Sequence, residues 1–566
     1  MAASALPILC TAIAPKSFVS SLPCPTPINL LRSKIVCSFV RSVKATPTEV
    51  EEEAAAGGGG GTKLSAWTSV PQQRWEGDMV VDGQLPLWLN GTYLRNGAGL
   101  WEAGDLAFDH LFDGYATLIR VSFQQGRATG AHRQIESDAY MAANKDDPIV
   151  MQEFSQCPKP ANLLDRVRNV VGLLSGASVT DNPNVNVVPL GDGRVMCLTE
   201  TTKSSTLIDP DTLDTVGKFK YTDKLGAMIQ SAHPICTDSE FLTLLPETLT
   251  FSGRATLSSE LGQFYTFDCL PTSRSYMHVM CKSTGKTCEM VRSNQDLWKQ
   301  QPRYLYLRAV GEGVVHVHRG SSNLSVYLRD AVVHGSRGVL EELPGRWLAW
   351  RWPEVASVMV PPFMAIHFIN AYEEVDKHGE ATEIIADCCE QYGDPAIIKT
   401  LVLRQLRSFR GMDLLPNSRV GRFRIPLDGS TFGELQSALD PEEHGRGIEM
   451  CNINRARIGK KYRYAYGCGA RRPCNFFNTL TKMDLVLQKA MSWYEEGAVP
   501  SEPFFVARPG ASDEDDGAVM SIVSAEDGGG YMVVLDATTF KEIARVKFPY
   551  GLPYGFHGCW IPAKNS

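Results

Sequence analysis

Short apolar segments separated by turn residues constrain this chain's fold more than any other feature. From Trp67 to the C-terminus, runs rich in β-branched and aromatic residues are bounded by glycine, aspartate and proline, which is the pattern of strands and turns. Clear examples are residues 116–123, 195–201, 382–387, 420–425 and 462–468. Helical patterns are few, so the sequence predicts an all-β body.

A faint internal repeat indicates how these strands are organised. Residues 208–216 and 535–543 share an apolar residue, an aspartate, a threonine and a closing β-branched residue at the same spacing. Each copy predicts a strand, an Asx turn and a return strand. Antiparallel hairpins repeated over roughly 500 residues are most simply arranged as a β-propeller. A pair of barrels or sandwiches is the structural alternative.

Composition excludes several other classes of protein. The 566 residues are 43% hydrophobic, and their net charge is −7, with no block of Lys and Arg that could follow phosphates. A nucleic-acid partner is therefore not expected. No uncharged apolar run approaches the ~18 residues of a membrane span. The 15 cysteines are scattered and contain no C-x-x-C motif, which predicts reduced core residues rather than a zinc cluster.

The N-terminal region has a different composition from the body. Residues 1–48 contain no acidic residue but five Lys or Arg and seven serines, as is typical of an organelle transit peptide. Residues 49–66 follow as an acidic and Gly-rich linker. We therefore expect 67–566 to form a single domain.

Three histidines stand out among the 11 in the chain. His233, His367 and His557 lie among apolar or small residues, where a neutral ring with a fixed partner is expected. They are 134 and 190 residues apart, which excludes a local finger-type zinc site. They are either independent core residues or, if a propeller brings the inner ends of its blades together, ligands that converge on its axis.

Several segments in fixed order resemble the plant carotenoid cleavage dioxygenases. They are residues 87–97, 112–115, 230–234, 367–374, 501–506 with 514–517, and 554–558. Residues 136–140, 191–201 and 450–454 are similar to the carlactone synthase branch of that family, dioxygenase type eight of strigolactone biosynthesis.

This resemblance implies a seven-bladed β-propeller with a small helical cap and a non-haem Fe(II) on its axis. By motif, His233, His367 and His557 take three of the family's four ligand positions. Four imidazoles would leave two coordination positions open for O2, the co-substrate. The resemblance also implies that Glu200, Glu449 and Glu502 accept the second ring N–H of the histidines and so fix the tautomer.

The implied reaction is the oxidative cleavage of a conjugated C=C bond in a lipophilic apocarotenoid, inside the chloroplast. In the resembled branch, 9-cis apo-10′-carotenal becomes carlactone in strigolactone biosynthesis, which controls shoot branching. The alternatives are cleavage of all-trans apo-10′-carotenal to an apo-13-carotenone, or an iron-deficient propeller without activity. Apolar residues at helical spacing in 163–174 predict either a core-facing cap helix or a surface that contacts the plastid membrane.

The chain departs from the family between residues 250 and 356. The segment with the fourth histidine is missing, and residues 288–356 match no recognisable family text. The simplest interpretation is that coding sequence near 250–265 was skipped and non-coding sequence near 288–356 was read through. Within residues 288–356, only His316 and His318 have strand-like neighbours, so they are the candidates for a replacement fourth ligand.

Overall fold

The fold is described from a computed structural model of the chain. The chain divides into two units, residues 1–60 and 61–566, and the described residues all belong to the second. Apart from short gaps, the structure describes 65–143, 179–219, 232–236, 360–391, 401–407 and 418–563. Between 237 and 359 it gives the backbone of strands only. The predicted transit peptide, residues 1–48, and most of the predicted linker lie outside the described residues.

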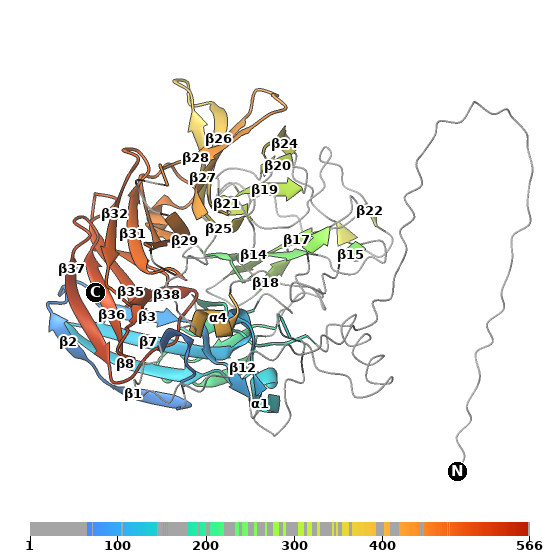
Figure 1. The fold of residues 1–566 in the computed structure, drawn as a ribbon. Helices are drawn as coiled ribbons and strands as arrows, with labels where there is room; N and C mark the ends of the chain where they lie inside the picture. The colour runs from blue at the N-terminus through green and yellow to red at the C-terminus, as the bar shows by residue number, and fades with distance from the viewer. Residues whose placement is uncertain are drawn as a thin grey trace, which may run out of the picture. The chain divides into compact units, whose positions relative to one another are not determined.

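Five antiparallel sheets of four or more strands make up the well-described body (Figure 1). The first contains β1 (Arg74–Asp78), β8 (Arg127–Gln134), β7 (Tyr115–Gln124), β3 (Gly91–Arg95) and β38 (Gly558–Pro562), with β4 (Ala98–Leu100) paired to β7. The second contains β12 (Thr215–Lys218), β11 (Thr206–Ile208), β10 (Val195–Leu198) and β9 (Asn186–Pro189). The third contains β25 (Ala365–Val375), β26 (Ala381–Gln391), β27 (Ser418–Pro426) and β28 (Glu434–Ser437). The fourth contains β29 (Arg446–Ile453), β30 (Tyr464–Ala470), β31 (Thr479–Asp484) and β32 (Lys489–Tyr494). The fifth contains β2 (Val80–Gly83), β37 (Glu542–Phe548), β36 (Gly530–Asp536), β35 (Gly517–Ser524) and β33 (Val499–Pro500), with β34 (Phe504–Ala507) paired to β35.

These sheets are the blades of a β-propeller. In each one a terminal strand, namely β38, β9, β25, β29 or β34, contributes residues to the wall of the same cavity. Strands that end five different sheets can line one cavity only if the sheets are arranged around a common axis. The all-β propeller predicted from the sequence is therefore confirmed, and the five predicted strand segments coincide with β7, β10, β26, β27 and β30.

The predicted count of seven blades is not confirmed, because five blades are fully described. The difference falls in the stretch from 235 to 359, where the structure gives strand backbones without side chains. Two further four-stranded sheets lie there. One contains β13 (Ile235–Cys236), β14 (Glu240–Pro246), β17 (Ser275–Cys281) and β18 (Thr287–Glu289), and the other β21 (Ser325–Leu328), β19 (Tyr304–Val310), β20 (Val314–Arg319) and β24 (Glu354–Met359).

Strands from the two ends of the domain close the ring. β38 pairs with β3, and β2 pairs with β37, both in antiparallel register. Each of the two sheets therefore contains strands that are separated by more than 400 residues in the sequence. Closure of this kind removes the exposed sheet edges that a linear array of blades would leave at its ends.

The internal repeat forms the two predicted hairpins, β11–β12 and β36–β37. At the turns, Asp209 Oδ1 accepts hydrogen bonds from the backbone N–H groups of residues 211 and 212, and Asp536 Oδ1 accepts one from Thr539. Leu213 and Phe540, at equivalent positions, have φ angles of 60° and 55°. The shared sequence pattern therefore encodes the same Asx turn with a left-handed residue at its end.

Short helices share one hydrophobic cluster at the end of the blades. The cluster draws on η1 (Ser65–Trp67), η2 (Leu111–Asp113), α1 (Asp138–Ala143) and α4 (Leu403–Arg407), and it includes Phe476, Tyr554 and Phe556. We call this group of residues the cap cluster. Residues 163–174, predicted as a further helix, lie outside the described residues.

Among the described helices, none is both long and apolar enough to cross a bilayer. The seven cysteines in the described part are free thiols, and six of them are buried.

Candidate metal centre

Three histidines that are distant in sequence meet at the axial cavity. His233 lies two residues before the short strand β13, His367 lies in β25, and His557 directly precedes β38. Their ring centroids are 5.2 Å (His233–His367), 4.7 Å (His233–His557) and 5.1 Å (His367–His557) apart. One ring nitrogen from each lies within 4.8 Å of the other two. The three histidines therefore converge at the propeller axis and are not independent core residues.

Glu449 fixes the ring of His367. The Nδ1 atom of His367 lies 2.6 Å from Glu449 Oε2, and the carboxylate is 2% exposed. The same carboxylate accepts hydrogen bonds from Gln391 Nε2 at 2.7 Å and from the backbone N–H of Met450 at 3.0 Å. With Nδ1 held by Glu449, Nε2 is the ring nitrogen of His367 that would bind a metal ion.

A β-bulge in β29 gives Glu449 this orientation. The pairing of β29 with β30 shifts register on both sides of Glu449, and the next residue, Met450, has a φ of 54°. Such an angle is uncommon for a residue other than glycine. Bulges re-aim side chains beside active sites, and here Glu449 faces His367 while Met450 packs into the cap cluster.

Glu502 acts on His557 in the same way. The Nδ1 atom of His557 lies 3.0 Å from Glu502 Oε1, and the backbone N–H of Gly558 donates to Oε2 at 3.2 Å. Glu502 is 6% exposed. Two of the three predicted carboxylate–histidine pairs are therefore present, and both involve buried carboxylates.

For the third histidine, His233, the described hydrogen bond involves the backbone of the preceding residue. Burial lowers the pKa of His233 to about 4, against an opposing effect of the Glu502 charge, so the ring is neutral at neutral pH. Its predicted partner, Glu200, lies outside the described residues. Asn186 donates from Nδ2 to the carbonyl of Ala232, the residue before His233, at 2.8 Å.

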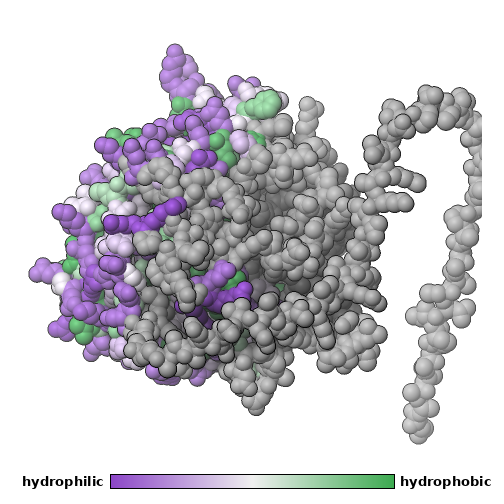
Figure 2. Space-filling model, viewed as in Figure 1, coloured by the Kyte–Doolittle hydropathy of each residue, from purple (hydrophilic) through white to green (hydrophobic). Residues whose placement is uncertain are grey.

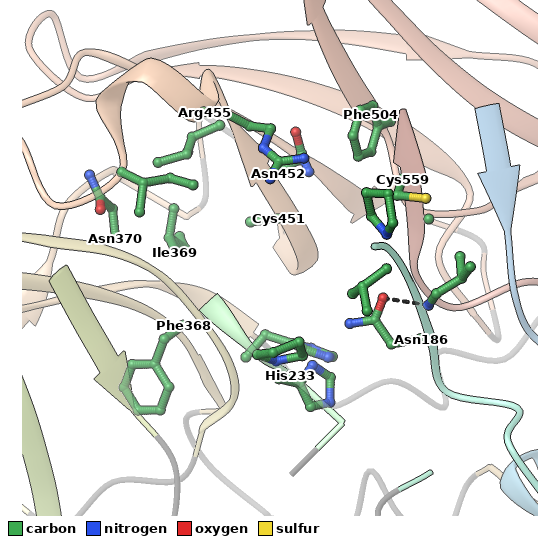
Figure 3. Close-up of a pocket in the computed structure, with 18 of the residues that line it drawn as sticks. Asn186, His233, Phe368, Ile369, Asn370, Cys451, Asn452, Arg455, Phe504 and Cys559 are labelled. Atoms are coloured by element: carbon green, nitrogen blue, oxygen red, sulfur yellow. Dashed lines mark hydrogen bonds between the residues drawn. The ribbon is translucent and has the colours of Figure 1, made fainter. Parts of the chain in front are cut away.

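The cavity beside the histidines has a volume of about 280 Å³ (Figure 3). Apolar side chains such as Phe368 and Phe504 form part of its wall, and its polar residues include Asn186, Asn370, Asn452 and Arg455. The cavity therefore continues from the histidines along the inner strands of the blades.

Figure 2 shows one face of the molecule, where polar side chains dominate the described surface over the outer strands.

The sequence-based search missed three residues of this site. Gln391, Asn186 and the left-handed Met450 belong to no short motif with a stated role, so only the geometry identifies them. His316 and His318, the candidates for a fourth ligand, lie in β20, and their side chains fall outside the described residues. In the part of the chain with described side chains, His233, His367 and His557 form the one cluster with metal-ligand spacing.

Three imidazoles near two buried carboxylates suit a divalent transition metal. Imidazole nitrogen is a good ligand for iron, zinc, copper and nickel. The carboxylates hold the tautomers and offset the positive charge of a divalent ion. This set of three imidazole nitrogens therefore fits a divalent metal ion, and all three side chains are described.

Comparison with known proteins agrees with this geometry. A sequence model of the family described as retinal pigment epithelial membrane protein matches residues 67–260 and 341–562. The chain also matches crystal structures of an ACO/RPE65 chimera (TM-score 0.63, 21% identity) and of Synechocystis apocarotenoid oxygenase with cobalt substituted (TM-score 0.62, 20% identity). Both comparisons cover 88% of this chain and 98% of the other, and they establish the fold.

Curated relatives are considerably more similar in sequence. Carotenoid cleavage dioxygenase 8 homolog A, chloroplastic, from Oryza sativa subsp. japonica is 56% identical over 89% of this chain and 89% of its own length. Carotenoid cleavage dioxygenase 8, chloroplastic, from Arabidopsis thaliana is 48% identical over 88% of this chain and 85% of its own length. On this similarity, the chain belongs to the carotenoid cleavage dioxygenase family.

Proposed function

We propose that this protein is an Fe(II)-dependent dioxygenase that cleaves one conjugated C=C bond of an apocarotenoid. Membership of the family makes it a dioxygenase, and the chloroplast is its location, as in its relatives. The observation that carries the iron assignment is the convergence of three imidazoles, two of them held at Nδ1 by buried glutamates. Iron in such a site supplies the activation of O2.

The protein's own residues prepare the site in two ways. His233, His367 and His557 would hold the ion, with Glu449 and Glu502 fixing the ring tautomers of the latter two. Burial of both carboxylates keeps water from competing for their hydrogen bonds. We extend the same role to Glu200 behind His233, as the family motif predicts. His316 and His318 stay the candidates for a fourth ligand.

We also propose that the complete propeller has seven blades. The five fully described blades leave one stretch of the domain, from residue 235 to residue 359, and two further four-stranded sheets lie within it. Counting each sheet as one blade gives the number that the family resemblance predicts. The atypical segment 250–356 would then contribute strands to both of these blades.

The substrate that we propose is 9-cis apo-10′-carotenal, converted to carlactone in strigolactone biosynthesis and the control of shoot branching. Relatives named carotenoid cleavage dioxygenase 8 support it, at identities of 48–56%. The alternative is cleavage of all-trans apo-10′-carotenal to an apo-13-carotenone. A lipophilic substrate of this kind favours peripheral contact with a plastid membrane, to which residues 163–174 would contribute.

Metal content and product analysis test the proposal together. The protein is produced with added Fe(II), and its bound iron is measured beside that of His233→Ala and of His378→Ala, a control at an exposed hairpin tip. We expect close to one iron per chain in the unmodified protein and the control, and a clear loss in His233→Ala.

Incubation with each apocarotenal isomer under O2 then identifies the product. Carlactone from the 9-cis isomer supports the proposed branch activity, and an apo-13-carotenone from the all-trans isomer supports the alternative. An unmodified protein that cannot be loaded with stoichiometric iron contradicts the function and leaves the iron-deficient propeller.

A further inference from the structure

Two histidine segments are tied together by a pair of asparagine side chains. The backbone N–H of Asn96 donates to the carbonyl of His557 at 2.9 Å, and the backbone N–H of Phe556 donates to the carbonyl of Asn96 at 2.8 Å. Asn96 is fully buried. The segment that carries His557 is therefore held along the backbone of Asn96.

The side chain of Asn96 continues this connection toward the next blade. Its Nδ2 donates to the carbonyls of Pro183 and Asn186, and its Oδ1 accepts from the backbone N–H of Gly97 at 3.0 Å. Both N–H groups and the oxygen of the carboxamide are thus used. Because carboxylate oxygens cannot donate, aspartate at position 96 would lose the hydrogen bonds to the carbonyls of Pro183 and Asn186.

Asn186 carries the connection to the second histidine segment. Its Oδ1 accepts from the backbone N–H of Val187 at 2.8 Å, which orients Nδ2 toward the carbonyl of Ala232, 2.8 Å away. Ala232 is fully buried and directly precedes His233. Asn186 and His233 both line the cavity (Figure 3).

From these contacts we infer that Asn96 and Asn186 are positioning residues, which set the distance between His557 and His233 together with the direct bond from the His557 N–H to the carbonyl of Val185, at 3.3 Å. This inference deepens the proposed function and rests on it. A metal requires its ligand atoms at a fixed spacing, and the two asparagines fix that spacing before an ion arrives. Neither side chain is itself a ligand.

Asn184 offers a matched control two residues from Asn186. It is 4% exposed and donates from Nδ2 to two backbone carbonyls, those of Phe112 and Gly114, but to no segment that carries a histidine of the site. Asn184→Asp therefore removes similar hydrogen bonds from the same stretch of chain. A purely structural role for Asn186 would make the two variants behave alike.

The experiment compares Co(II) affinity, by competition with a chelator, and metal-free melting temperature in the full-length protein. We expect Asn186→Asp and Asn96→Asp to bind Co(II) about 10- to 100-fold more weakly, the usual cost of losing a group that orients a metal ligand. Asn184→Asp should bind as the unmodified protein does. The metal-free melting temperatures of Asn186→Asp and Asn184→Asp should fall by similar amounts.

The outcomes separate this inference from the function on which it rests. If the unmodified protein binds no Co(II) or Fe(II), the proposed metal site fails and the inference fails with it. If it binds metal and Asn186→Asp binds with equal affinity, only the positioning role is overturned. Should Asn186→Asp not fold, Asn186→Ser and Asn184→Ser, which introduce no charge, replace the aspartate pair under the same criteria.

Discussion

Among single residues, Glu449 connects a histidine of the site to the neighbouring strands by hydrogen bonds. It accepts hydrogen bonds from His367, Gln391 and the backbone of Met450. Glu449→Gln keeps the shape but removes the negative charge and places an amide group where only acceptors fit. We expect metal affinity to fall about 10- to 100-fold, as measured by chelator competition.

Glu374→Gln is the control for this substitution, because Glu374 lies on the same strand as His367 and pairs with Lys461 on the surface. That exposed pair should contribute little to stability and nothing to metal binding. Equal metal affinity in Glu449→Gln and Glu374→Gln would contradict the role of Glu449 in orienting His367.

His132 predicts a pH dependence that is independent of the metal site. Burial lowers the pKa of His132 below its usual 6.5, and its Nε2 donates to the carbonyl of Gln72 at 2.9 Å while Nδ1 contacts the Tyr550 hydroxyl. Above pH 6.5 the ring is neutral in both folded and unfolded chains. Below it, the unfolded chain takes up the proton first, so the free energy of unfolding falls with the pH.

His132→Gln should therefore flatten the loss of stability as the pH falls below 6.5, measured by urea unfolding at several pH values. His378→Gln, at an exposed hairpin tip, provides the comparison. An unchanged pH profile in His132→Gln would contradict a neutral, buried imidazole at this position.

The residues of the site differ in how far the sequence could predict them. His233, His367, His557, Glu449 and Glu502 were predicted because each lies in a segment that resembles the family. Gln391 and Asn186 could not be, because their importance comes from a partner on another strand. An asparagine that donates to a distant backbone carbonyl leaves no local sequence pattern.

At the scale of strands, a graded series of ion pairs joins β26 to β27. Asp387 is fully buried and accepts two hydrogen bonds from Arg422, at 2.7 and 2.8 Å, and one from the Tyr462 hydroxyl at 2.6 Å. The carboxylate in turn raises the pKa of Arg422. Asp387→Asn would leave a largely buried guanidinium without its counter-charge and should cost about 3–5 kcal/mol of unfolding free energy.

Glu383 and Arg424, on the same two strands, form the matched pair near the surface, with side chains 25% and 39% exposed. Glu383→Gln should cost less than about 1 kcal/mol. Urea unfolding of both variants measures the difference. Similar losses in the two would show that burial does not determine the strength of these pairs.

Local pattern predicted the strands well where hydrogen bonding is local. The aspartates of the repeat specify the turns of β11–β12 and β36–β37, because their side chains accept hydrogen bonds from nearby backbone N–H groups. The bulge in β29 was not predicted. Its left-handed residue is Met450 rather than glycine or asparagine, so packing against the cap, not local preference, determines the conformation there.

For the whole molecule, the sequence predicted a propeller but could not fix its blade count. Repeated hairpins indicate radial repetition, yet the number of blades depends on long-range closure and on residues 235–359. Convergence of the histidines also belongs to this scale, since it exists only when inner strands from different blades face one axis. Local spacing left it open beside independent core histidines, and only the resemblance favoured it.

Ring closure by the C-terminal strand leads to a prediction about the entire fold. β38 forms the inner edge of the first blade through its pairing with β3, and Cys559 of β38 is buried among residues from two blades. Deletion of residues 558–566 removes this strand, its apolar burial and the Gly558 contact to Glu502. The loss is on the order of 5 kcal/mol, which at about 2 °C per kcal/mol lowers the melting temperature by about 10 °C.

Two further deletions serve as controls for this experiment. Removal of residues 564–566 leaves β38 intact, and removal of residues 1–60 takes away the unit that is separate from the propeller. Both should leave the melting temperature and the metal affinity within error of the full chain, as measured by differential scanning calorimetry and chelator competition. A chain without residues 558–566 that unfolds at the same temperature as these controls would mean that the ring does not depend on β38, and that the pairing of β2 with β37 suffices to close it.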